Sequence, residues 1–286
     1  MLDRRACARN FARTGRAAQA HRVRTRRPGA RACRLILIFY AFSRELGPLK
    51  RRLKERAPLA EPGLRGFESR AGGRRIVFVA TGIGAERAGE AARIAMGRFS
   101  PELVIGTGVV GALSAGLSPG DIVLAERIML SPEGEGAVQE PAIAIAGDTL
   151  RHCEHALKRA GLDFARGGLL TSRRVLANAH AKLRAKEQTG AIAVDMESAA
   201  LASEAVRRGI KFAVVRTVMD ALEDEVFGAE LADGQGRVRP LAAAGYLARN
   251  PAAIAQLPRM MRNLSRATRS LADAIEAIGL AAPLAR

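Results

Sequence analysis

The sequence predicts a single α/β domain with a mixed, mostly parallel central sheet flanked by helices. Short apolar runs such as Leu35–Tyr40 and Arg75–Ala80 lack polar alternation, which is typical of strands buried on both faces. A segment with the pattern of a helix, Ala85–Arg98, follows the second run. Because strands that alternate with helices usually pair in parallel, this order favours an α/β layer structure.

The other elements follow from local patterns along the chain. Leu46, Leu49 and Leu53 recur at helical spacing, so a helix is expected after the first strand. The turn residues of Ser118–Gly120 precede the fourth strand, and the glycine-rich stretch after the third strand is expected to bend. The expected strands are Leu35–Tyr40, Arg75–Ala80, Glu102–Ile105, Asp121–Ala125, Ala191–Val194 and Lys211–Val215, and the expected helices are Ser43–Glu55, Ala85–Arg98, Thr149–Ala160, Ala179–Gln188 and Glu197–Arg208.

The composition is that of a globular protein, with 48% hydrophobic and 26% charged residues among 286. These values exclude a disordered chain, a collagen-like fibre and a disulfide mini-protein. Aromatic residues are only 4%, so the core is expected to consist of Ala, Val, Ile and Leu. Cys7, Cys33 and Cys153 are odd in number and scattered, which predicts neither a disulfide framework nor a zinc cluster and favours a reducing compartment.

A basic arm, residues 1–33, accounts for half of the formal net charge of +18. It holds ten arginines and one acid, with too few large apolar residues to offset the entropy of ordering it, so disorder is expected. An upstream start codon, a tether to nucleic acid or anionic lipid, and an organelle transit peptide are the alternatives. A signal peptide is disfavoured because the apolar run Leu35–Phe42 is short and follows an overlong basic stretch. No aromatic platform accompanies the arm, so no nucleic-acid partner is expected.

The last segment, residues 237–286, is expected to form a basic helical tail after the main domain, residues 34–236. It has eight arginines and two acids. Two interpretations stay open, a surface helix packed on the domain or a basic amphipathic helix resting on anionic lipid. No run in the sequence reaches the length of a membrane-spanning helix. The expected apolar stripe of the tail is Met260, Leu264, Leu271 and Ile275.

The run Gly106–Gly111 fits the glycine pattern of dinucleotide-binding loops, but the turn-rich residues after it cannot begin the helix that such a loop needs. We expect instead a backbone loop with free N–H groups near the carboxyl end of a strand, where α/β proteins bind ligands. His152 and His155 lie three residues apart on an expected helix without a matching carboxylate. Surface positions are therefore expected for them, and no metal site is predicted.

Acidic residues follow two of the expected strands. Asp195 and Glu197 lie where a strand turns into a helix. A helix cap explains one of these acids, and the other is suited to a pair of sugar hydroxyls because a carboxylate accepts two hydrogen bonds. Asp220 follows the last strand, where it either starts a turn or joins the same edge of the sheet. These acids are therefore candidates for one site.

Five segments, taken in order, resemble the nucleoside phosphorylase and nucleosidase family, especially the bacterial nucleosidases that act on methylthioadenosine and S-adenosylhomocysteine. The resemblance covers about Leu35 to Asp220. Each segment alone is only weakly specific, whereas the five segments in this order are fairly specific to the family. The segments are the first strand with Glu45, Thr81–Gly84, Gly106–Gly111 with Ser118–Ile122, Val194–Glu197, and Arg216–Asp220.

The resemblance implies a role for each matching residue. Asp220 matches the acid that protonates the purine, and Glu45 matches the carboxylate that holds the attacking water, so both would be catalytic. Glu197 matches the residue that binds the ribose hydroxyls. The implied substrate-binding residues are Glu197, Met196, Thr81, Gly82, Thr107, Gly108, Val175, Leu176 and Arg216.

Two departures from the family pattern bear on the chemistry. Met219 precedes the acid where the nucleosidases often have serine. Gly106 and Val109 stand where phosphorolytic members hold phosphate with an arginine. Loss of that side chain favours water over phosphate as the nucleophile, although Arg87 or Arg216 could substitute.

The basic tail resembles that of a subgroup associated with hopanoid biosynthesis, whose proposed substrate is adenosylhopane, a membrane triterpene linked to adenosine. The resemblance therefore implies an enzyme that releases adenine from a 5′-substituted nucleoside without a metal or cofactor. It also implies a homo-oligomer located in the cytoplasm or at the inner face of the membrane. A phosphorylase or nucleosidase of nucleoside salvage is one alternative, and a non-catalytic nucleoside-binding or membrane-scaffold protein on the same fold is another.

Overall fold

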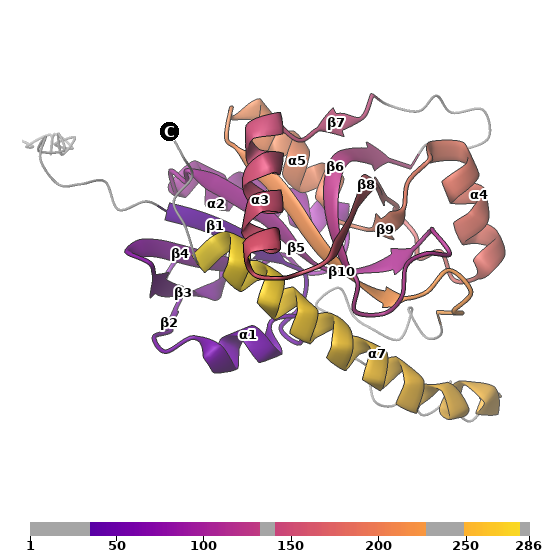
Figure 1. Cartoon of the computed structure of the whole chain (residues 1–286). Coiled ribbons are helices and arrows are strands. Elements are labelled where there is room, and N and C mark those ends of the chain that lie inside the picture. Colours follow the sequence, from indigo (N-terminus) through magenta and orange to yellow (C-terminus); the bar gives the residue numbers. More distant parts are fainter. Residues whose placement is uncertain (1–34, 132–140, 227–248, 281–286) are drawn as a thin grey trace, which may run out of the picture. The chain divides into compact units, whose positions relative to one another are not determined.

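The computed structural model describes residues 35–131, 141–226 and 249–280. The predicted disorder of the arm, residues 1–33, lies outside these ranges, as does the start of the tail. Figure 1 shows a central sheet with helices packed around it. The helices are α1 (Gly47–Arg52), α2 (Ala85–Arg98), α3 (Gly147–Arg159), α4 (Ala179–Thr189), α5 (Ser198–Arg207) and α7 (Pro251–Ile275), which continues into a π-helical turn (Glu276–Leu280).

Ten strands form one sheet within the described part of the chain. They are β1 (Leu35–Tyr40), β2 (Ala57–Pro58), β3 (Arg65–Ala71), β4 (Arg74–Ala80), β5 (Leu103–Ala112), β6 (Ile122–Leu130), β7 (Ile143–Ala144), β8 (Phe164–Thr171), β9 (Ala193–Asp195) and β10 (Phe212–Asp220). Their order is β10-β6-β8-β9-β5-β1-β4-β3-β2, with β7 on β6. Because β5 also pairs with β10, five strands close into a ring from which β1, β4, β3 and β2 extend.

The central strands β4, β1, β5 and β10 pair in parallel, as do β6, β8 and β9. Antiparallel pairs join β6 to β10, β6 to β7 and β9 to β5, and they also add β3 to β4 and the edge strand β2 to β3. The predicted class, a mixed sheet flanked by helices, is confirmed. The carboxyl ends of β1, β4, β5 and β10 share one edge of the sheet, which is where open α/β folds bind ligands.

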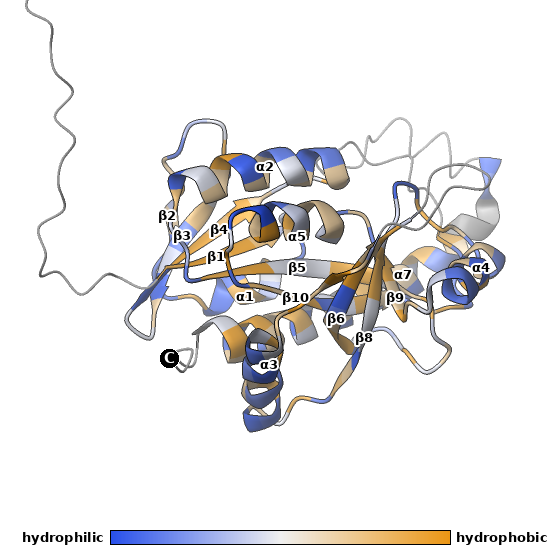
Figure 2. Ribbon diagram, turned by 90° about the horizontal axis from the view of Figure 1, so that it is seen from above, coloured by the Kyte–Doolittle hydropathy of each residue, from blue (hydrophilic) through white to orange (hydrophobic). Residues whose placement is uncertain are grey.

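Small and aliphatic side chains fill the space between the sheet and its helices, as the composition predicts. Figure 2 shows α2 and α5 on one side of the sheet and α1 and α3 on the other. Buried alanines such as Ala92 of α2 and Ala202 of α5 belong to this core, and they let the helices approach the sheet and each other closely. The described core is continuous from β1 to the end of α7.

Helix α1 covers only the middle of the expected helix Ser43–Glu55. The residues before it form a turn instead, in which the N–H of Glu45 donates to the carbonyl of Phe42 at 3.1 Å. Pro48 lies in the first turn of α1, where an N–H donor is not needed. The turn, rather than a helix, presents Glu45 at the carboxyl end of β1.

Strands β5 and β10 are longer than expected. The predicted bend at Gly106–Gly111 is wrong, because these residues continue β5, and Arg216–Asp220 continues β10. The two strands pair along this length, with Gly108 opposite Arg216. Glycine is unfavourable in an isolated strand, but here side chains of neighbouring elements occupy the space beside the glycines. No helix follows the run, which agrees with the rejection of a dinucleotide-binding loop.

Strands β3 and β8 are not expected from the sequence. β3 lies near the edge of the sheet and its exposed positions are polar, while β8 carries Gly167 and Gly168 in its middle. Both features weaken the apolar pattern by which strands are recognised. Their pairing with β4 and β6 provides the hydrogen bonds that hold them.

Helix α7 has a buried half and an exposed half. Leu271 and Ile275 lie in the core at 0% and 1% exposure. Ile254, Met260 and Met261 are exposed at 50%, 41% and 51%. The expected apolar stripe therefore packs on the domain only in its second half. Within the three described ranges, the structure contains no helix long and apolar enough to cross a bilayer.

Candidate active site

Glu45 is held by backbone N–H groups from the turn after β1 and from β5. Its Oε2 accepts hydrogen bonds from Ala41 and Phe42 at 2.8 and 3.0 Å, and its Oε1 accepts one from Val109 at 3.0 Å. Burial raises the pKa of Glu45, and these hydrogen bonds together with Arg216 oppose the rise. A carboxyl group held in one orientation with a raised pKa is suited to accept a proton from water.

Glu45 and Arg216 both point to the space beside Gly108 of β5. A β-carbon at Gly108 would lie 2.5 Å from both Glu45 Oε1 and Arg216 Nη1, and the φ angle of this glycine is +143°. A side chain is therefore excluded both by these atoms and by the backbone conformation. The glycine creates the space in which the carboxylate and the guanidinium approach each other.

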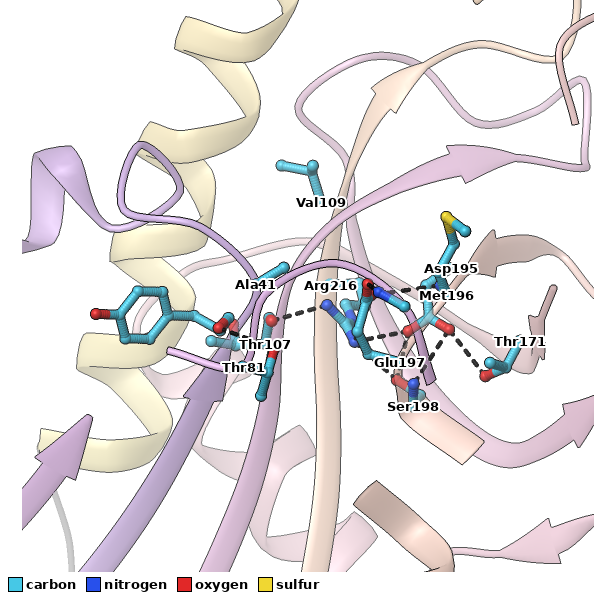
Figure 3. A network of polar contacts seen from close by, with 12 residues as sticks. Ala41, Thr81, Thr107, Val109, Thr171, Asp195, Met196, Glu197, Ser198 and Arg216 are labelled. Carbon is cyan, nitrogen blue, oxygen red and sulfur yellow. Dashed lines mark hydrogen bonds and ion pairs between the residues drawn. The ribbon is translucent and has the colours of Figure 1, made fainter. Parts of the chain in front are cut away.

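Arg216 lies at the centre of the polar network and is 1% exposed. Figure 3 shows its guanidinium between Thr107 and Asp195. Its Nη2 lies 2.6 Å from Asp195 Oδ2 and 4.0 Å from Glu197 Oε2, and its Nη1 donates to the carbonyl of Thr107 at 2.7 Å. Carboxylates from three elements, Glu45 included, thus surround one cation.

Asp195 joins this network to the start of α5. Its Oδ1 accepts a hydrogen bond from the Thr171 hydroxyl at 2.9 Å and another from the N–H of Ser198 at 3.3 Å. The hydroxyl of Ser198 donates to the other oxygen. Glu197 is the N-cap residue of α5, but Asp195 is the acid that accepts the first N–H of this helix, and its oxygens are already bonded to protein groups.

The second of these two acids, Glu197, has a raised pKa. Its Oε1 accepts a hydrogen bond from the N–H of Gly84 at 2.8 Å. Burial and the nearby charge of Asp195 raise the pKa of Glu197 from 4.5 to about 7, while Arg216 opposes the rise. Such perturbed carboxyl groups are typical of functional sites.

Asp220 ends β10 at the same edge of the sheet. A β-carbon at Gly111 would lie 2.9 Å from Asp220 Oδ2, so this acid lies beside β5 three residues beyond Gly108, or about 10 Å along the strand. Burial raises the pKa of Asp220, and Lys182, whose Nζ lies 2.6 Å from Oδ2, opposes the rise. A carboxyl that is largely shielded from water and has a raised pKa is suited to keep a proton for donation.

The other predicted binding residues differ in their surroundings. The hydroxyl of Thr81 donates to the carbonyl of Gly82 at 2.7 Å. Thr107 Oγ1 is buried and has no hydrogen-bond partner among the described residues. Val175 is 41% exposed, and Leu176 packs against a small apolar cluster. No contact of Val175 or Leu176 decides its role, so their assignment to substrate binding stays a prediction.

Three residues of the network are not singled out by the sequence pattern. Thr171 belongs to β8, which is not expected, and Ser198 is visible only as a neighbour of the acids Asp195 and Glu197. Lys182 lies on α4 among other basic residues, and nothing in the sequence distinguishes it. Lys182 is identified only by its burial and by its contact with Asp220 in the folded structure.

The paired histidines lie on α3, where His155 is exposed and His152 is half-buried. Burial and nearby cations, Arg74 first among them, lower the pKa of His152. Across the described ranges, no group of three or more His, Cys, Asp or Glu side chains is arranged to hold a metal ion.

A model of the phosphorylase superfamily matches residues 35–244, which include every site residue described above. The chain belongs to the phosphorylase superfamily. The family expected from the five ordered segments is therefore confirmed, and the match extends from β1 through β10.

Curated relatives of this phosphorylase-superfamily chain are nucleosidases. It is 26% identical over 196 residues to the 5′-methylthioadenosine/S-adenosylhomocysteine nucleosidase of Staphylococcus epidermidis, covering 65% of this chain and 86% of that protein. The corresponding enzyme of Oceanobacillus iheyensis is 25% identical over 198 residues, with 66% and 86% covered.

Solved structures share the fold at lower identity. The Neisseria meningitidis 5′-methylthioadenosine/S-adenosylhomocysteine nucleosidase in complex with methylthio-immucillin-A has a TM-score of 0.64 at 18% identity, covering 86% of this chain and 98% of that one. The futalosine hydrolase of Helicobacter pylori has a TM-score of 0.63 at 16% identity, covering 86% and 97%. At these identities the likeness shows the fold.

Proposed function

We propose that this protein hydrolyses the N-glycosidic bond of a 5′-substituted adenine nucleoside and releases adenine. Asp220 protonates the purine as the bond breaks, so that the electron pair leaves with a neutral base. Glu45 takes a proton from the water that attacks the anomeric carbon, and Glu197 accepts hydrogen bonds from the ribose hydroxyls. The nucleosidase relatives, of whose length 86% is matched, support this reaction class.

The observation that carries the proposal is that carboxyl groups from distant segments of the chain lie beside one strand, β5, near its carboxyl end. Glu45 and Arg216 lie beside Gly108, and Asp220 lies beside Gly111, which is about 10 Å further along the backbone of β5. In a displacement at the anomeric carbon, the nucleophile and the leaving base lie on opposite sides of the sugar. The group that holds water and the group that protonates the base must therefore be two different residues, and Glu45 and Asp220 are the candidates.

The charge of the site supports water rather than phosphate as the nucleophile. Glu45, Asp195 and Glu197 surround a single cation, Arg216, whose Nη atoms are already bonded to protein oxygens. A phosphate dianion would be repelled by these carboxylates, whereas water is neutral. Arg87, the other candidate for phosphate, is exposed and donates to a backbone carbonyl.

We expect adenine release in phosphate-free buffer at a rate that added phosphate does not raise. The purified full-length protein is assayed with methylthioadenosine, S-adenosylhomocysteine and adenosylhopane, and the sugar product is identified by mass spectrometry. A free sugar supports hydrolysis. A sugar 1-phosphate formed only when phosphate is present would show phosphorolysis, and no adenine from any of the three would contradict the proposed reaction.

We further propose that the 5′ substituent is a lipid, as in adenosylhopane, and that the enzyme works at a membrane surface. The exposed half of α7 supports this proposal, because Ile254, Met260 and Met261 are exposed and the exposed Arg262 directly follows them. Exposed apolar and basic residues on one helix suit the surface of an anionic bilayer.

We expect the full-length protein to co-sediment with anionic phospholipid vesicles. Changing Ile254, Met260 and Met261 together to Ser should remove most of this binding, because the apolar contact is lost while the charge is kept. The second half of α7 belongs to the core, so truncating the tail would unfold the domain instead. Val206→Ser, at a 61% exposed position of α5, is the control. Equal sedimentation of the triple variant and the wild type would contradict the membrane proposal.

A further inference from the structure

A buried lysine lies against the proposed catalytic acid. Lys182 of α4 is 0% exposed, and its Nζ donates to Asp220 Oδ2 at 2.6 Å. The same nitrogen donates to the carbonyls of Ala221 at 2.7 Å and Asp224 at 3.0 Å. A lysine ammonium has three N–H donors, and all three are used here. The geometry is therefore that of a charged lysine.

The position of this lysine reverses the ordinary pattern of a surface helix. On α4 the neighbouring Leu183 is 42% exposed, whereas Lys182 is fully buried. Burying an ammonium group costs free energy unless the charge is paired and hydrogen-bonded. Departures from the hydrophobic pattern are expected where function, rather than stability, determines the residue.

We propose that Lys182 is the positioning residue of the catalytic acid: it holds one carboxyl oxygen of Asp220 and stabilises the carboxylate that remains after proton transfer. This inference rests on the function proposed above. The proton moves from Asp220 to a nitrogen of the base, the electron pair of the breaking C–N bond goes to the base, and Lys182 keeps its own proton throughout. A fixed charge placed where negative charge develops stabilises the transition state.

The groups around Asp220 agree with this role. Lys182 from α4 and Asp224 from the turn after β10 are the charged groups that act most strongly on Asp220 among the described residues. β5 presents Gly111, and Arg259 of α7 pairs with Asp224 at 2.6 Å. Burial and Asp224 raise the pKa of Asp220, while Lys182 lowers it. The lysine therefore makes Asp220 a stronger acid than burial alone would.

Replacing Lys182 by Met is expected to lower kcat for adenine release at pH 7 by about tenfold or more, because the acid is less well placed and gives up its proton less readily. The upper limb of the kcat/KM profile should move to higher pH by about one unit or more, since an opposite charge has been removed from Asp220. The activity of the variant relative to the wild type therefore rises with pH. Lys186→Met, also on α4, is the matched control and should keep the wild-type profile.

If the role of Lys182 were purely structural, its replacement would lower the melting temperature of the protein without moving the upper limb of the kcat/KM profile. An unmoved upper limb in folded Lys182→Met would therefore overturn the proposal. If circular dichroism shows that Lys182→Met does not fold, Lys182→Gln keeps an N–H donor and must show the same shift. In Asp220→Asn, adding Lys182→Met should cause no further loss of kcat, and a full additional loss contradicts the proposal. A wild-type protein that releases no adenine would instead contradict the proposed function.

Discussion

Asparagine in place of Asp220 is expected to lower kcat for adenine release by about 10²- to 10⁴-fold, with little change in affinity for the nucleoside. Asparagine has nearly the same shape and still accepts a hydrogen bond from Lys182, but it has no acidic proton for the purine. The base would then have to leave as an anion. The loss should therefore appear in kcat rather than in KM.

A coupled assay of adenine release measures this loss, and calorimetry with the inactive variant measures binding. Glu223→Gln, at an exposed acid in the turn after β10, is the matched control and should keep wild-type turnover. Because burial raises the pKa of Asp220, the wild-type rate should fall as pH rises through that pKa, and the residual activity of Asp220→Asn should lack this fall. Wild-type turnover by Asp220→Asn would show that another group is the acid.

Methionine in place of Arg216 is expected to reduce the free energy of unfolding by about 3–5 kcal/mol. The guanidinium is the central cation of a buried cluster, and its removal leaves Glu45, Asp195 and Glu197 without a compensating charge. Repulsion among buried carboxylates then has to be relieved by protonation or by opening of the site. Urea denaturation followed by circular dichroism measures the change, with Arg87→Met, an exposed arginine, as the control.

The pH dependence of this effect follows from the raised pKa of Glu197, about 7 against an ordinary 4.5. A carboxyl whose pKa is higher in the folded state stabilises the fold below the unfolded pKa, and this contribution is lost as pH rises through the folded pKa. Stability of the wild type should therefore fall between about pH 5 and pH 7. In Arg216→Met the fall should be larger, because the cation that lowers the pKa of Glu197 is gone. Equal stability of Arg216→Met and Arg87→Met at pH 8 would contradict this account of the cluster.

The elements that the sequence predicts best are those whose pattern depends only on burial. The helix Ala85–Arg98 has the predicted bounds, because alanines at helical spacing face the sheet along its whole length. The run Gly106–Gly111 is different, since glycine alone indicates a bend. Its extended conformation depends on pairing with β10 and on the side chains of Glu45 and Arg216, which occupy the space beside the glycines. Neither β10 nor Glu45 is close to this run in the sequence, so no local pattern predicts its extended conformation.

The residues of the candidate site likewise divide into those that the sequence predicts and those that only the tertiary structure identifies. The family resemblance points to Glu45, Glu197 and Asp220 from three distant segments, and each lies near the carboxyl end of a strand, where parallel strands expose side chains to one edge. Lys182 carries no such signal, because a lysine on a helix is ordinarily solvated. Its role arises only where α4 packs against the end of β10.

By itself, the order of apolar runs and acids determined an α/β domain with carboxyl groups at one edge, because periodicity and strand direction are local properties of the chain. Only the tertiary structure decided how those carboxyl groups are charged. Proton affinity depends on burial and on the few ångströms that separate Arg216 from Glu197 and Lys182 from Asp220, and such distances are set when distant segments pack together.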